Sequence, residues 1–316
     1  MKRISAVLLI IGMAFIAFAL KRDPAYQLAR LKGADAKIEL HVIDDESNVV
    51  ANTCVQVFMG MNFRPEGYWI KGYTSTNGIF LIKGKTCGDE VEILLSKGGY
   101  YSSSKKLCFA AMGAELDVKD GKWQPYGGRK DIELRKIRKP VKLMCETLFI
   151  DIAETNRWIG FDMSAKDFVH PWGKGVTADL EIRSEWDGKA PIGSKMCYGE
   201  LRFTQPFAGG YYAKKIVESS YPYVYGARRD DGYAVSGVKV VNRMGSPGFT
   251  KVPFREDSVL VTRTRCVIDV ATGKLESANY GYIKDFMISP SWKGKCTLRL
   301  FYIFNPTPND TNLEHR

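Results

Sequence analysis

The chain has 316 residues, 45% of them hydrophobic, and a formal net charge of +11, values typical of a basic globular protein. Its seven cysteines form no C-x-x-C pair and its three histidines form no His-Glu-x-x-His motif, which argues against zinc ribbons, thioredoxin-type sites and zinc hydrolases. No Gly-x-Ser-x-Gly and no complete Gly-x-x-x-x-Gly-Lys-Ser/Thr loop occurs, so an α/β serine hydrolase and a P-loop enzyme are excluded.

The N-terminus has the pattern of an export signal. A basic pair precedes an apolar run over residues 4–20, and Ala17-Phe18-Ala19 supplies small residues where signal peptidase reads the chain. This predicts a signal peptide over 1–19, followed by a spacer over 20–36. The run is short for a bilayer span, so an uncleaved anchor is the alternative and the only predicted membrane contact. We expect an exported protein that is periplasmic, part of the cell envelope, or secreted.

The next hundred residues follow the two-residue period of half-buried strands. Ile38, Leu40 and Val42 alternate with polar neighbours, which predicts the first strand. Ser75-Thr76-Asn77-Gly78 predicts a hairpin turn, because Asn-Gly accepts the positive φ values that such turns require. Further strands are predicted over 50–58, 68–73, 79–82, 90–95, 100–109 and 130–134. Short strands at this spacing are typical of a β-sandwich.

Several of these residues match a known family pattern. Strands 38–44 and 52–57 match its first two strands, and 72–81 matches its Thr-Asp-x-Asn-Gly-x-Phe hairpin, with Ser75 replacing the usual Asp. Gly98-Gly99-Tyr100-Tyr101 and 131–134 match its last strands. Segment 37–137 therefore resembles a carboxypeptidase regulatory-like domain, a transthyretin-like β-sandwich. In carboxypeptidases this domain accompanies the zinc enzyme, of which no residues are found here. The resemblance implies a fold and an exported setting, but no peptidase activity.

The second half begins after a basic segment with Pro140, predicted as a linker over 138–146. Ala271-Thr272-Gly273-Lys274 predicts a hairpin turn. Strands are predicted over 177–183, 196–204, 233–242, 258–269, 275–283 and 297–304. The predicted fold class is therefore all-β: a transthyretin-like β-sandwich followed by a second β-rich domain over 147–316. That half is similar only to uncharacterised exported bacterial proteins.

Three carboxylates make the densest polar cluster of the sequence. Asp162, Asp167 and Asp179 surround His170, and carboxylates in such a cluster could hold a metal ion or act as acid and base. The spacing is poor for calcium, so the three are only weak metal candidates. The alternative is a turn-rich connection in which Asp and Ser bind backbone amides.

Aromatic residues alternate with glycine and basic residues in a second cluster. Exposed aromatic faces stack on sugar rings or bases, and arginine adds positive charge. The alternative is a pair of long loops whose tyrosines cover the edge of the core. The predicted ligand-binding residues are Tyr211, Tyr212, Tyr221, Tyr223, Tyr225, Arg228 and Arg229.

An exported chain can form disulfides, and the odd cysteine count leaves at least one thiol unpaired within the chain. We hypothesise the bridges Cys87–Cys108 and Cys266–Cys296, although pairing cannot be deduced from sequence.

These observations favour an exported, non-enzymatic binding or scaffolding protein of the cell envelope, without a cofactor. The expected partners are an anionic polysaccharide, a glycan or another envelope protein, and no nucleic acid is expected. Two alternatives stay open: a carboxylate-dependent hydrolase that uses segment 162–179, and a purely structural envelope subunit that assembles through exposed strand edges.

Overall fold

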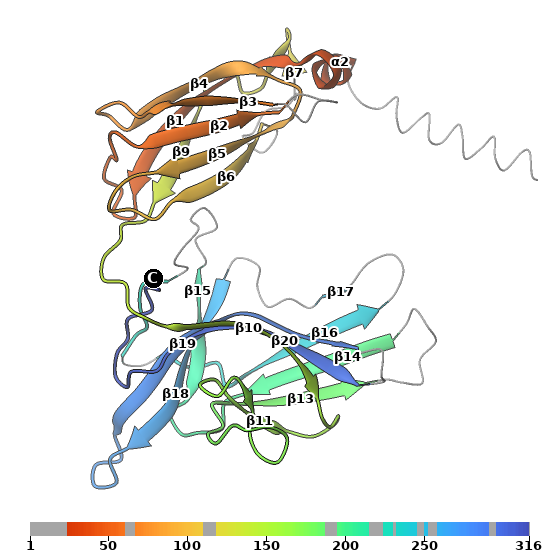
Figure 1. Ribbon diagram of the computed structural model, residues 1–316, viewed down its shortest axis with the longest axis vertical. Coiled ribbons are helices and arrows are strands. Elements are labelled where there is room, and N and C mark those ends of the chain that lie inside the picture. Colours follow the sequence, from red (N-terminus) through yellow and green to blue (C-terminus); the bar gives the residue numbers. More distant parts are fainter. Residues whose placement is uncertain are drawn as a thin grey trace, which may run out of the picture. The chain divides into compact units, whose positions relative to one another are not determined.

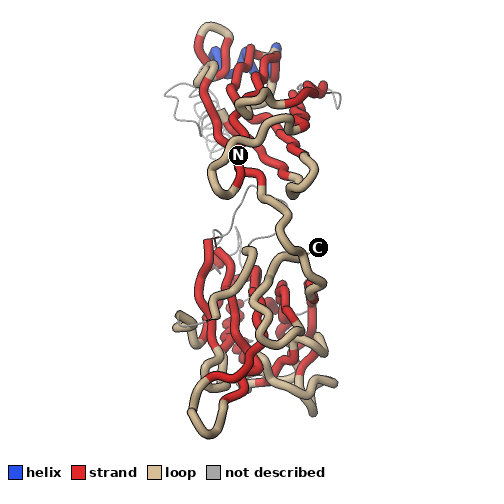
Figure 2. The backbone as a smooth tube through the Cα atoms, turned by 90° about the vertical axis from the view of Figure 1, so that its left-hand side faces the viewer, coloured by secondary structure: helices blue, strands red, loops and turns tan. Residues whose placement is uncertain are grey.

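The computed structural model describes residues 24–60, 67–109, 118–186, 195–214, 224–229, 232–244, 250–251, 258–290 and 295–315. The chain divides into two compact units, the first ending at Ile137 and the second beginning at Arg138. Strands make up most of each unit, and the short helix α2 (Pro24–Lys32) belongs to the first (Figure 2). The predicted all-β class is confirmed. The predicted signal peptide lies outside the described residues.

The first unit is a sandwich of two sheets (Figure 1). One sheet has the order β4-β1-β8-β7, and β9 also pairs with β1 in parallel. It contains β1 (Ala34–Asp44), β4 (Ile79–Thr86), β7 (Val118–Lys119), β8 (Lys122–Trp123) and β9 (Gly128–Leu134). The other has the order β3-β2-β5-β6 and contains β2 (Cys54–Met59), β3 (Tyr68–Tyr73), β5 (Glu90–Ser96) and β6 (Ser103–Cys108).

The core of this unit lies between the two sheets. In β1, Ile38, Leu40 and Val42 are fully buried and alternate with partly exposed residues, as the sequence period predicts. They belong to one apolar cluster with Val57 of β2 and Ile93 of β5. The segment predicted as a spacer over 20–36 partly folds here, because α2 (Pro24–Lys32) buries Ala29 in the same cluster.

The turn before β4 corrects one prediction. Gly78 has the expected positive φ of 69°, and its amide donates to the Ser75 carbonyl. The flanking strands do not pair with each other, however: β3 pairs with β2, whereas β4 pairs with β1 of the other sheet. The turn therefore crosses between the sheets and is not a hairpin. Local chemistry set the turn, but long-range pairing set the partner strands.

The second unit also contains two facing sheets. One has the order β10-β20-β19-β18-β15, made of β10 (Met144–Ile152), β15 (Gly209–Lys214), β18 (Ser258–Ile268), β19 (Leu275–Pro290) and β20 (Cys296–Asn305). The other has the order β12-β11-β13-β14-β16-β17, made of β11 (Ile159–Asp162), β12 (Asp167–Phe168), β13 (Leu180–Trp186), β14 (Lys195–Arg202), β16 (Gly237–Met244) and β17 (Thr250–Lys251). β18 and β19 form the predicted hairpin, in which Gly273 has a φ of 67°.

Apolar side chains cover both faces of the five-stranded sheet. Phe286, Leu300 and their neighbours fill the space between the sheets, and Val259, Tyr282 and others form a second cluster with Leu313. This explains why β18 is buried without alternation from Ser258 to Thr264.

The linker predicted over 138–146 is part of the second unit. β10 begins at Met144 and pairs with Phe304 of β20, and Val141 bridges to His315. The positive charges and Pro140 suggest a spacer, but the backbone groups of this segment are hydrogen-bonded to residues near Glu314.

Candidate functional site

Two of the three predicted carboxylates are buried and bind a partly buried arginine in the second unit. Arg265 donates to both oxygens of Asp179 at 2.8 and 2.9 Å, and to Asp162 Oδ1 at 2.8 Å. The Asp179 side chain is completely buried and that of Asp162 is 7% exposed. We call these three residues the buried arginine cluster.

Backbone geometry directs Arg265 into this cluster. The residue has a positive φ of 52° and lies where the β18–β19 register shifts between Thr264 and Val267. A bulge of this kind re-aims a side chain. Because Asp162 ends β11 and Asp179 precedes β13, the arginine of one sheet is tied to the other sheet.

Both carboxylates of this cluster accept several hydrogen bonds. Asp162 also accepts from the amides of Ser164, Ala165, Val176 and Thr177 at 2.9–3.0 Å, and Asp179 from that of Met163 at 2.8 Å. Burial opposes ionisation of Asp162, but three of these amides and Arg265 outweigh it and hold its pKa below the ordinary value.

This arrangement fits the turn-rich connection considered from the sequence. A carboxylate with about four acceptor positions has none to spare for a substrate proton once five donors are in place. The cluster therefore serves to hold the two sheets in register, and its chemistry is that of a structural ion pair.

The third predicted carboxylate is occupied by a turn of its own. Asp167 accepts from the amides of Phe168 at 2.8 Å and Lys174 at 3.1 Å. Within the described ranges, no three His, Cys, Asp or Glu side chains lie close enough together to hold a metal ion.

The predicted aromatic face is not a single surface. Tyr211 and Tyr212 are adjacent in β15, so their side chains point to opposite faces of the sheet, and each packs against a different apolar cluster. β15 is a strand where the sequence suggested a loop. A Cβ atom on Gly210 would come within 2.6 Å of the Leu260 side chain, which explains why glycine occupies this strand position. Tyr221 and Tyr223 lie outside the described residues.

Arginines of the chain itself already occupy part of this aromatic cluster. The Arg228 guanidinium lies 4.7 Å from the ring centre of Tyr211, and Arg263 lies 4.2 Å from that of Tyr233. The Tyr233 hydroxyl donates to the Arg228 carbonyl at 2.8 Å. Burial raises the pKa values of Tyr211 and Tyr233. Arg229 is exposed and reaches the Asn309 carbonyl at 3.5 Å.

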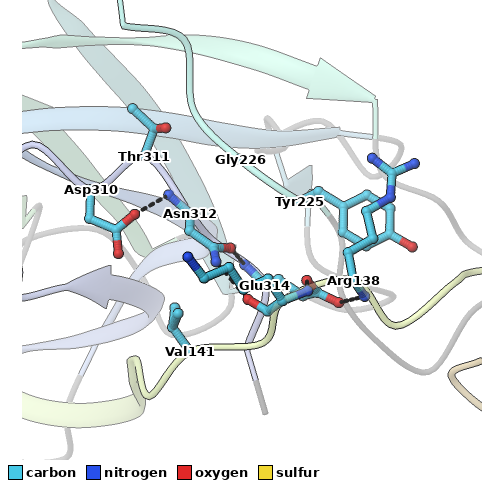
Figure 3. Close-up of a pocket in the computed structure, with 9 residues that line it drawn as sticks. Arg138, Val141, Tyr225, Gly226, Asp310, Thr311, Asn312 and Glu314 are labelled. Carbon is cyan, nitrogen blue, oxygen red and sulfur yellow. Dashed lines mark hydrogen bonds between the residues drawn. The ribbon is translucent and has the colours of Figure 1, made fainter. Parts of the chain in front are cut away.

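Tyr225, by contrast, lines an open pocket of about 370 Å³, which we call the Arg138 pocket (Figure 3). Three segments of the second unit form it. Its residues are Arg138, Lys139, Val141, Tyr225, Gly226, Asp310, Thr311, Asn312 and Glu314. Figure 3 shows the Arg138 side chain against the Tyr225 ring, with the guanidinium 4.3 Å from the ring centre.

Hydrogen bonds to the buried Glu314 fix the floor of the pocket. Its carboxylate accepts from the amides of Arg138 at 2.8 Å and Lys139 at 2.5 Å. Asn312 joins the same segments, because its amide group donates to the Lys139 carbonyl at 2.6 Å. The backbone amide of Asn312 donates to the Asp310 carboxylate at 3.0 Å. The backbone positions are thus fixed, while two cationic side chains and Asp310 border the opening.

Sequence reasoning found Tyr225 but missed the rest of this pocket. The alternating polar residues Asp310, Asn312 and Glu314 are a signal in the sequence, since such side chains bind nearby backbone groups. The partners that Asn312 and Glu314 bind in segment 138–139 are more than 170 residues away in the chain, which no local pattern predicts.

No disulfide joins the seven cysteines in this structure, and the hypothesised bridge Cys87–Cys108 stays a prediction. The geometry does not favour the hypothesised bridge Cys266–Cys296, because β19 separates their strands, Cys266 packs on the outer face of the sheet, and Cys296 lies in the core between the sheets. The Sγ atom of Cys296 instead lies 3.0 Å from that of Cys197.

No family model and no curated protein matches the chain. Among solved structures, catechol 1,2-dioxygenase of Acinetobacter radioresistens is similar over 34% of this chain and 54% of its own, at 15% identity and a TM-score of 0.27. 3-Chlorocatechol 1,2-dioxygenase of Rhodococcus opacus 1CP is similar over 37% of this chain and 63% of its own, at 14% identity and a TM-score of 0.26.

A putative membrane-associated protein of unknown function from Bacteroides fragilis aligns over 89% of this chain and 99% of its own, at 10% identity and a TM-score of 0.21. The dioxygenase alignments span only about half to two thirds of those chains. These scores are too low to support an inference about fold or function. In the part of the chain that the structure describes, no helix is long and apolar enough to cross a membrane.

Proposed function

We propose that the chain is an exported, non-enzymatic binding protein of the cell envelope, and that the Arg138 pocket binds sugar units of an anionic polysaccharide. The export signal at residues 1–19 and the mature charge of +9, from +11 minus Lys2 and Arg3, support the setting and the preference for an anion.

The observation that carries the proposal is the composition of the pocket. It combines an aromatic ring, two cationic side chains and the amide and carboxylate groups of Asn312 and Asp310 on a fixed backbone (Figure 3). Sugar recognition uses such a mixture: apolar ring faces pack on an aromatic side chain, and hydroxyl groups exchange hydrogen bonds with amides and carboxylates. Arg138 and Lys139 add an attraction for uronate groups.

Affinity chromatography on a polyuronate such as alginate tests this proposal, with neutral dextran as the reference polymer. We expect retention on alginate that falls as salt rises, and about tenfold weaker binding for Tyr225→Ala and Arg138→Ala. Arg229→Ala is the matched control, because this exposed arginine lies outside the pocket. Absence of alginate retention, or equal losses in all three variants, would contradict a site in this pocket.

The hydrolase alternative is less well supported by the geometry. An acid–base pair needs carboxylates that can exchange protons with a substrate, and general acids usually have raised pKa values. Asp162 has a lowered pKa, and its oxygens and those of Asp179 are bound to amides and Arg265. We therefore expect Asp167→Asn, the variant least coupled to this cluster, to leave any hydrolytic rate on a polysaccharide unchanged.

A further inference from the structure

Cys197 and Cys296 form a buried sulfur pair between the two sheets of the second unit. Their Sγ atoms are 3.0 Å apart, and both residues are completely buried. Cys197 lies on β14 of the six-stranded sheet, and Cys296 is the first residue of β20 in the five-stranded sheet. Their side chains meet across the apolar core that the sheets share.

We propose that these two residues form a disulfide that joins the sheets. Two facing strands already hold the sulfur atoms in contact, so the bond needs only a small displacement and no rearrangement of the backbone. The other two cysteines of the five-stranded sheet, Cys145 and Cys266, pack on its opposite face and do not compete. An exported chain would reach a compartment that permits such a bond.

Bond formation is an exchange with a disulfide-bearing oxidant. Each cysteine loses its S–H bond, one S–S bond forms between them, and the S–S bond of the oxidant breaks. With oxidised glutathione, the two electrons and two protons that leave the cysteines appear in two molecules of reduced glutathione. The exchange has to precede closure of the core, because the folded unit buries both sulfur atoms.

The folded environment also protects the pair. Both sulfur atoms are completely buried between the sheets. Exchange requires a thiolate that reaches the sulfur atom it attacks, so the folded protein should react slowly with external thiols. The bond would close a loop of about 100 residues, a length at which a disulfide strongly restricts the unfolded chain.

The test is refolding of the mature chain in oxidised and reduced glutathione, followed by thiol counting in denaturant and peptide mapping without reduction. We expect five reactive thiols, seven minus two, and one linked pair of peptides that contains Cys197 and Cys296. We also expect the second unit to melt about 10 °C lower after full reduction. These measurements use the unaltered sequence, so they do not depend on a variant that folds.

Variants separate this pair from the other cysteines. Cys197→Ala should give six reactive thiols and no linked peptides, whereas the matched control Cys145→Ala, on β10 of the same unit, should give four and keep the link. Seven reactive thiols in the unaltered chain, or a link from Cys296 to Cys266, would overturn the proposal. The result is independent of alginate binding, so either proposal can fail alone.

Discussion

In two polar clusters of the second unit a buried carboxylate accepts hydrogen bonds from backbone amides, but the arginine of each cluster is placed differently. In the buried arginine cluster and in the Arg138 pocket, a buried carboxylate accepts backbone amides from a distant segment. In the first cluster the counter-charge, Arg265, points inward to the carboxylates. In the second, the carboxylate of Glu314 binds the backbone amide of Arg138, and the Arg138 side chain lies over the Tyr225 ring at an open pocket.

This difference separates structural from functional candidates. A carboxylate and an arginine that are bound to each other have few donor or acceptor positions left for a ligand. When backbone amides bind the carboxylate, as in the Arg138 pocket, the cationic side chains of the same residues line the pocket. Charge density in the sequence cannot distinguish the two, because it counts side chains without showing what they bind.

The largest effect is expected from Arg265→Met. This change leaves two buried carboxylates without their cation, which typically costs about 3–5 kcal/mol of unfolding free energy. Urea unfolding measures it, with the transition of the second unit assigned by hydrogen exchange.

The control for this variant is Arg157→Met. Arg157 forms an exposed ion pair with Glu154, so we expect a loss below about 1 kcal/mol. Similar values for the two variants would mean that the buried arginine cluster does not hold the sheets together.

A smaller loss is expected from Glu314→Ala. The change leaves the Arg138 and Lys139 amides without their acceptor, and charge-assisted hydrogen bonds of this kind contribute about 1.5–3 kcal/mol. It should also abolish alginate retention, because these bonds position the pocket segments.

Asp310→Ala provides the comparison, since Asp310 accepts the Asn312 amide within its own segment. It should destabilise less than Glu314→Ala. If Glu314→Ala binds alginate normally, Glu314 does not shape the binding site.

Strong acid should weaken the buried arginine cluster. The folded pKa of Asp162 lies below the ordinary value of 3.8, so its contribution to stability is complete above the unfolded pKa and is lost as pH falls through the folded pKa. We therefore expect the urea concentration at the unfolding midpoint of the second unit to decrease once the pH is lower than about 4. Asp162→Asn should reduce this dependence, and a midpoint that is constant from pH 7 to pH 2.5 would contradict the ion pair.

The smallest effect is expected from Arg228→Ala. Its guanidinium lies over the Tyr211 ring at an exposed position, where cation–π contacts contribute about 0.5–1 kcal/mol. Thermal melting and alginate retention should both change little. A tenfold loss of retention would move the binding site from the Arg138 pocket to the aromatic cluster predicted from sequence.

The sequence predicts where the strands lie better than it predicts which strands pair. Alternation identifies β1, and Gly78 and Gly273 mark turns at the expected positive φ. Pairing is a long-range property, so the Gly78 turn was assigned the wrong partner strands, and the contact of Cys296 with Cys197 was not foreseen. β15 was missed because Gly209-Gly210 is typical of a loop, whereas here glycine admits the side chain of Leu260.

The pairing of β10 with β20 has a consequence for the order of folding. Met144 is paired with Phe304, 160 residues later (304 − 144), and the pocket floor needs Glu314 as well. The second unit therefore cannot complete its five-stranded sheet until the ribosome has added nearly all of the sequence shown, whereas the first unit has all its strands by Leu134. Before β20 is synthesised, the unpaired edge of β10 and the apolar faces of β18 and β19 can aggregate. A chaperone that binds the chain during synthesis or export would reduce this risk.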